Sequence, residues 1–182
     1  QSWGSLTFGT DRLGRSQLSR VIYGARSSLT VGVASTAIGV VVGGTFGVLA
    51  GYFRSKVDAV IGAIANMILT LPGIVLLLAM SAIFTPSLRT LLIGLGLLAT
   101  PIFFRISRAA TMTVASRDFV TAARAAGAGN VRILVKELVP NVVTSMVAYA
   151  FVLVAVLITV EGSLSYLGVG IPPPTPSWGG MI

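Results

Sequence analysis

Long apolar runs alternate with short charged segments along most of the chain. No charged residue lies between Arg26 and Arg54, and none lies between Asp58 and Arg89. A helix needs about 20 apolar residues to cross the hydrocarbon core of a bilayer, and each run is long enough to do so. With two later runs, the pattern predicts about four membrane spans, over roughly residues 28–51, 58–84, 88–110 and 139–160.

The first span carries a regular series of glycines, Gly39, Gly43, Gly47 and Gly51. A four-residue spacing places bare backbone along one side of a helix, which allows another helix to approach closely. The alternative is the ordinary tolerance of membrane helices for glycine. The spacing favours a helix-packing role.

Two polar or helix-breaking positions interrupt the second span. Pro72 leaves the carbonyl four residues earlier without its donor, so we expect a kink there. Asn66 lies one and a half turns before it, and a buried amide in lipid needs partners. Asn66 therefore faces either a neighbouring helix or a water-filled path, which makes Asn66 and Pro72 candidate residues of a translocation path.

The third span is short, because only residues 90–104 are uncharged between Arg89 and Arg105. We expect its flanking arginines to reach the interface along their aliphatic stems, and Pro101 to bend the helix. The segments before and after the spans, residues 1–26 and 161–182, are mixed or rich in proline. They are expected to lie at the outer interface. Both ends resemble cuts inside a larger protein, with one further span expected at each end.

Composition supports a membrane protein and removes several kinds of chemistry. Charged residues are 10% of the 182, against roughly 25% in a soluble domain, and mean hydropathy is +0.93. The sequence has no cysteine and no histidine, which excludes thiolate nucleophiles, disulfides and His/Cys metal sites in this chain. The net charge of +8 is typical of basic residues flanking spans, so we expect no nucleic-acid partner.

Basic residues also predict an orientation. Loops 52–58 and 105–137 hold eight of the thirteen: Arg54, Lys56, Arg105, Arg108, Arg117, Arg124, Arg132 and Lys136. Cytoplasmic loops carry the excess of Lys and Arg. The segment 111–138 is therefore predicted to be cytoplasmic, in a multi-pass protein of the cell membrane.

This cytoplasmic segment predicts a short helix beginning at Asp118, whose side chain is expected to cap it. Its helical spacing places Phe119, Ala122, Ala123 and Ala126 on one face. Gly127 and Gly129 are expected to end this helix. Alanines bury little surface but form a smooth ridge that fits a partner's groove. An amphipathic connector resting on the bilayer is the alternative.

After this helix, residues 131–138 favour a second one, and Pro140 is expected in the first turn of the last span. The order TAA, three residues, Gly127, nine residues and ELVP resembles the "EAA" loop of bacterial ABC-importer permeases. The similarity extends through FGTDRLGRSQLSRVIYGARSSL, LAGYF and DFVTAARAAGA to EGSLSYLGVGIPPPTPSWGGMI. The chain is thereby identified as a member of the C-type permease subunits of dipeptide, oligopeptide and nickel importers.

The resemblance implies an all-α type I permease fold, here four spans of a six-helix protein. It also implies that Asp118, Thr121, Ala122, Ala123, Ala126 and Gly127 form a coupling helix in a cleft of a cytoplasmic ATPase. The expected partners are a B-type permease chain, two ATPase subunits or domains, an extracytoplasmic binding protein and membrane lipid. The sequence has no GxxxxGK[ST] loop, so ATP and Mg²⁺ are expected in the ATPases and no cofactor in this chain.

Six positions depart from the family pattern, and two of them, Glu137 and Val139, replace the usual isoleucine and leucine before Pro140. Thr121 replaces the usual glutamate, which removes the reciprocal half of a cap with Asp118. Leu6 and Thr7 stand where His-Pro is common, and Asn66 stands where an acidic residue is frequent. Contact at Thr121 is therefore expected to depend on shape more than on charge.

Other functions fit the residues less well. An ion-coupled transporter usually places ionisable groups near the midplane, whereas the carboxylates here fall at span ends or in loops. A membrane enzyme lacks a catalytic constellation, and a simple anchor does not need the patterned outer ends. The expected function is peptide uptake by alternating access, with nickel or another metal chelate as the alternative substrate.

Overall fold

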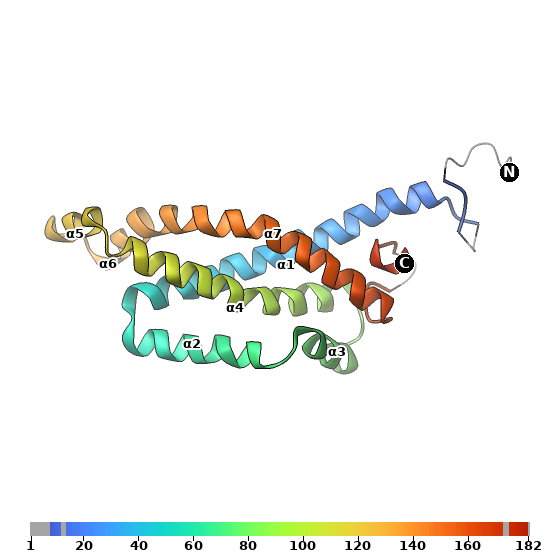
Figure 1. Ribbon diagram of the computed structural model, residues 1–182, viewed down its shortest axis with the longest axis horizontal. Coiled ribbons are helices and arrows are strands. Elements are labelled where there is room, and N and C mark those ends of the chain that lie inside the picture. The colour runs from blue at the N-terminus through green and yellow to red at the C-terminus, as the bar shows by residue number, and fades with distance from the viewer. Residues whose placement is uncertain (1–7, 12–13, 173–174, 182) are drawn as a thin grey trace.

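The computed structural model describes residues 8–11, 14–172 and 175–181, and nearly all of them are helical. Figure 1 shows three long helices packed side by side along the long axis, α1 (Gln17–Phe53), α4 (Leu88–Val114) and α7 (Val139–Tyr166). Within the described ranges, three helices are long and apolar enough to cross a membrane. A fourth crossing results if the bent pair α2–α3 is one span.

Helix α1 begins earlier than the predicted first span. Ser16 has an extended backbone and its side chain accepts the Ser19 N–H, which is how a helix N-terminus is capped. Residues 17–26, the last part of the segment 1–26 that was predicted to be interfacial, therefore form the first turns of one continuous helix. Residues 1–7, with Leu6 and Thr7, and residues 12–13, 173–174 and 182 lie outside the described part.

Helices α1 and α4 are in close backbone contact. Gly39, Gly43, Gly47 and Gly51 are all buried in this contact. A Cβ atom at Gly39 would lie 2.5 Å from that of Ala99, and one at Gly51 would lie 2.8 Å from the Arg108 carbonyl oxygen. The four-residue glycine spacing thus sets how closely the two helices approach.

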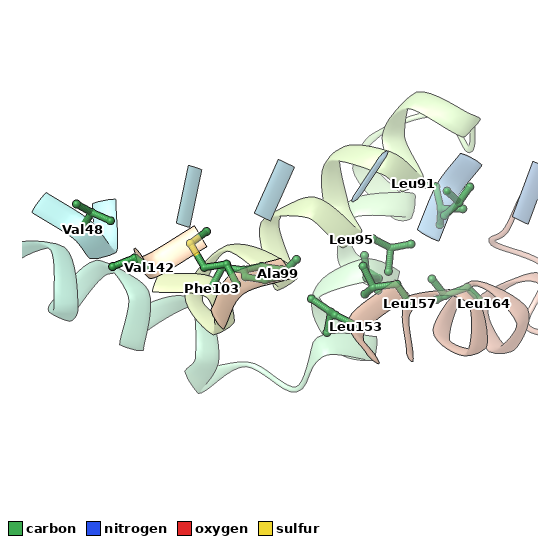
Figure 2. Close-up of a cluster of buried hydrophobic side chains, with 12 residues drawn as sticks. Val48, Leu91, Leu95, Ala99, Phe103, Val142, Leu153, Leu157 and Leu164 are labelled. Atoms are coloured by element: carbon green, nitrogen blue, oxygen red, sulfur yellow. The ribbon is translucent and has the colours of Figure 1, made fainter. Parts of the chain in front are cut away.

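The main core lies where α1, α4 and α7 meet. Its central side chains are fully or almost fully buried, and Figure 2 shows how they follow one another along the helices. They include Val48 from α1, then Leu91, Leu95, Ala99 and Phe103 from α4, and Val142, Leu153, Leu157 and Leu164 from α7. This apolar seam fixes α4 between its two long neighbours.

The second predicted span is broken at its proline. Helix α2 (Ser55–Thr70) and helix α3 (Gly73–Ile83) meet at 83°. Leu71, which precedes Pro72, is extended with φ −90° and ψ 133°, as steric contact with a proline ring favours. The predicted kink is therefore a complete break, with Pro72 at the N-cap of α3.

A sharp turn joins α1 to α2. Arg54 and Ser55 both have positive φ, at 53° and 48°, a conformation that side chains with a Cβ rarely adopt. The turn folds α2 back along α4 (Figure 1). It places Asp58 and Asn66 of α2 opposite Arg108 and Arg105 of α4.

The glycine contact predicts that two matched substitutions in the full-length protein differ in their effect on stability. Gly43→Ala places a Cβ against the backbone of Thr100 and Phe104, and overpacking of this kind costs about 1–3 kcal/mol. Gly62→Ala meets nothing within 4 Å and is expected to leave stability unchanged or slightly raised. Thermal unfolding of the two variants in detergent checks this, and equal stabilities would contradict a packing role for Gly43.

Candidate functional site

The predicted loop lies at one end of the bundle. Helix α5 (Asp118–Ala125) and helix α6 (Asn130–Arg132) extend beyond the last turn of α4, followed by the π-helix η2 (Ile133–Leu138). Figure 1 shows this end opposite the start of α1 and the end of α7. The length of the bundle therefore separates the loop from the segments at the start of α1 and after α7.

The N-terminus of α5 differs from the prediction. Arg117 occupies the N-cap position with an extended backbone, and no side chain caps the helix there. The expected capping role of Asp118 is therefore wrong, because Asp118 is already the first helical residue. Its carboxylate still lies where the helix dipole favours negative charge.

The C-terminus of α5 falls where the sequence predicted it. Gly127 has φ 81°, its N–H donates to Arg124, and the Ala128 N–H donates 3.0 Å to the Ala123 carbonyl oxygen. This pair of hydrogen bonds is the Schellman motif, which requires a left-handed residue at the position of Gly127. Any residue with a Cβ would be strained there.

One buried side chain anchors α5, and the sequence analysis missed it. Val120 is 0% exposed and packs with Ile133 and Leu138, which are also fully buried. Nearby, the Tyr52 hydroxyl donates to the Asn130 side-chain oxygen over 2.8 Å. Ile133 and Leu138 lie beyond the end of α5. The helical periodicity of α5 alone therefore could not predict that Val120 is buried against them.

The alanine face of α5 is mostly exposed. Thr121, Ala122 and Ala126 are exposed and Ala123 is half-buried, while Phe119 beside them is 40% exposed. The anchor at Val120 lies on another side of the helix. Val120 therefore attaches α5 to the rest of the loop through one side of the helix. The small side chains on the other side remain accessible.

The segment after the loop is one helix with α7. Residues 130–166 pass as a single long helix, and the predicted separate helix over residues 131–138 is continuous with the span. Pro140 lacks an N–H and cannot donate to the preceding turn. The wider π-turn over Ile133–Leu138 precedes it, a local change of helix type that relieves such a defect.

A polar groove lies between α2 and α4, on the side of the bundle where Asn66 was predicted to matter. Asp58 and Arg108 form an ion pair through two hydrogen bonds. Arg105 donates to the Asn66 side-chain oxygen over 2.8 Å. The two arginines thus bond across to α2 instead of extending to an interface as expected, and Pro72 does not line this groove.

At the opposite end, Glu161 is a buried carboxylate that the sequence analysis placed at a span end. Its oxygens accept hydrogen bonds from Ser28 of α1 at 3.1 Å and from Ser165 at 2.8 Å. Ser28 also accepts the Trp178 N–H, and the Trp178 ring N–H donates to the Val21 carbonyl oxygen. The segment around Trp178, which was predicted to lie on the outer side, is thus attached to both α1 and α7.

These features define a polytopic α-helical membrane protein that presents a small-residue loop at one end and a fastened segment at the other. The chain belongs to the family of binding-protein-dependent transport system inner membrane components, whose family model matches residues 43–182. The resemblance to ABC-importer permeases is thereby confirmed.

Named relatives agree with this family. The di/tripeptide transport system permease protein DppC of Pseudomonas aeruginosa is 38% identical over 96% of this chain and 57% of its own length. The glutathione transport system permease protein GsiD of Pectobacterium atrosepticum is 34% identical over 96% and 58%. The chain thus spans somewhat less than three fifths of the length of these relatives.

A solved structure confirms the predicted fold. A chain of the MetNI methionine ABC transporter, in an inward-facing conformation, superposes with a TM-score of 0.76 at 23% identity. The match covers 85% of this chain and 77% of the other. The fold is that of a type I ABC-importer permease.

The anchor of α5 can be tested with two valine variants of the full-length protein. Val120→Ala removes buried carbons and is expected to weaken the loop's attachment by about 1–3 kcal/mol. Val131→Ala changes a side chain that is 74% exposed and serves as the control. Hydrogen exchange of residues 118–138 should rise in the first variant alone; equal exchange in both would refute the anchor.

Proposed function

We propose that the protein is the permease subunit of an ATP-driven ABC importer in the bacterial inner membrane. With a second permease chain it forms the pathway for uptake of dipeptides or oligopeptides by alternating access. Membership in a binding-protein-dependent transport family supports the class. Relatives named for di/tripeptide, dipeptide and glutathione transport support a peptide substrate.

The observation that carries the proposal is the exposed ridge of α5. Thr121, Ala122 and Ala126 have short, exposed side chains, while the buried Val120 attaches the helix through another side. A fixed helix that presents small side chains around one exposed aromatic ring, Phe119, fits a groove in another protein at little cost in side-chain entropy. We assign that groove to a cytoplasmic ATPase, in which ATP and Mg²⁺ bind.

The other end of the bundle supports a binding-protein partner. The segment from Ser177 to Met181 packs on the outer turns of α1 and α7, and Trp178 remains 38% exposed. A fastened surface with an exposed aromatic ring is suited to docking. An extracytoplasmic binding protein would deliver the peptide to this face.

Reconstitution tests the proposal as a whole. The full-length protein is purified with its membrane and cytoplasmic neighbours, placed in proteoliposomes, and supplied with the binding protein and ATP. We expect ATP-dependent accumulation of labelled di- or tripeptide. Accumulation of a nickel chelate alone would reassign the substrate, and uptake driven by an ion gradient without ATP would overturn the ABC assignment.

The coupling role of α5 predicts a charge-sensitive ridge. Ala122→Arg places an unpaired charge in the proposed ATPase contact, and we expect ATP-driven uptake to fall about tenfold or more. Ser116→Arg adds the same charge just before α5, at another exposed position, and is the control. Uptake and co-purification of the ATPase are measured together; normal values of both for Ala122→Arg would contradict the coupling role.

A further inference from the structure

The α2–α4 groove differs chemically from the other large hollows of the described surface. It has a volume of about 460 Å³ and is lined by Asp58 and Asn66 from α2 and by Arg105 and Arg108 from α4. Two hollows of about 400 Å³ between α1 and α7 are lined almost entirely by aliphatic side chains. A volume of this size is typical of small-ligand sites.

The groove reaches well into the bundle. Arg105 lies nine residues before the end of α4, or about 14 Å along a helix that rises 1.5 Å per residue. Asn66 lies eleven residues after the start of α2, about 16 Å along that helix. Both are exposed, and a charged group at this depth is costly against lipid, so this face lines water or protein.

The two arginines of the groove are compensated differently. Arg108 is neutralised by Asp58 through a two-bond ion pair. Arg105 donates to a neutral amide oxygen, and in the described part of the chain no carboxylate lies within ion-pair distance of it. The groove therefore carries one uncompensated positive charge, and that charge is on Arg105.

Asn66 completes a donor set beside this charge. Its side-chain oxygen accepts from Arg105, so its NH₂ group keeps two N–H donors. No acceptor for that NH₂ group occurs among the described residues. A guanidinium and an amide N–H side by side match the two oxygens of a carboxylate, which an arginine fork binds in two-bond geometry.

We propose that Arg105, oriented by Asn66, binds the C-terminal carboxylate of a peptide as it passes along the α2–α4 groove. This inference rests on the proposed function as a peptide permease. The terminal carboxylate is common to peptides of every sequence, so one arginine serves substrates with different side chains. Because the guanidinium is exposed in the groove and not buried, its hold on the carboxylate is weak enough for release.

The test compares a dipeptide with its C-terminal amide in the reconstituted complex. The amide has the same side chains but no terminal charge. For Arg105→Gln, uptake of the free acid, relative to wild type, should fall about tenfold or more, since charge-assisted bonds to the carboxylate are lost. Uptake of the amide, relative to wild type, should be unchanged. Normalising each peptide to wild type removes the preference of the binding protein.

Two further variants sharpen the comparison. Arg89→Gln removes the same charge from the first turn of α4, outside the groove, and is expected to leave both peptides unchanged. Arg105→Lys keeps the charge without the fork and should give intermediate uptake of the acid alone. Graded loss restricted to the acid is the signature of carboxylate binding.

Two outcomes would overturn the inference. Equal loss of acid and amide uptake in Arg105→Gln would mean that Arg105 has a structural role, either in packing or in an ion pair with an acidic residue of the second permease chain. Unchanged uptake of both would leave Arg105 without a role in passage. In either case the proposed function as a peptide permease stands as long as the wild-type complex accumulates peptide. If the wild-type complex accumulates neither peptide, the proposed function itself is wrong.

Discussion

The close approach of α1 to α4 is the constraint on which the other contacts depend. Hydrocarbon chains of lipid are as apolar as leucine side chains, so membrane helices associate mainly through packing and hydrogen bonds. Four buried glycines bring the two backbones together, and the Ser107 hydroxyl, bonded to the Phe103 carbonyl oxygen at 2.8 Å, lies at their contact. With α4 fixed in this way, one side of it packs on α7 and another forms the wall of the polar groove.

The polar contacts then divide by how completely they are satisfied. Asp58 with Arg108 joins α2 to α4, and Glu161 with Ser28 joins α7 to α1, while Ser165 of α7 donates to the second Glu161 oxygen. Glu161 and Ser28 are both fully buried, where satisfied polar groups specify one arrangement of the helices. Among the described residues, Arg105 has no carboxylate partner and Asn66 has free N–H donors, so their hydrogen bonding is incomplete. In this respect they differ from the two pairs that hold helices together.

Much of the fold follows from the sequence, because hydropathy and glycine spacing are local signals. The runs around residues 28–51 and 139–160, and the end of α5 at Gly127, needed no long-range information. The 83° angle at Pro72, the burial of Val120 and the contact of Glu161 with Ser28 did need it. The last two are set by residues distant in sequence, 133 positions away in the case of Glu161 and Ser28, whereas a proline predicts a kink without fixing its angle. Asp118 failed as a cap because Arg117 already had the extended backbone of that position.

The unbroken helix over residues 130–166 has a mechanical consequence. Its 37 residues extend about 55 Å at 1.5 Å per residue. Near one end Ile133 and Leu138 hold α5, and near the other Glu161 accepts a hydrogen bond from Ser28, which in turn accepts the Trp178 N–H. If this helix tilted as a rigid body by about 10° around its midpoint, each end would move by about 5 Å, in opposite directions. In the proposed transport cycle, such a tilt would couple movement of the α5 loop to movement of the segment at the other end of the bundle.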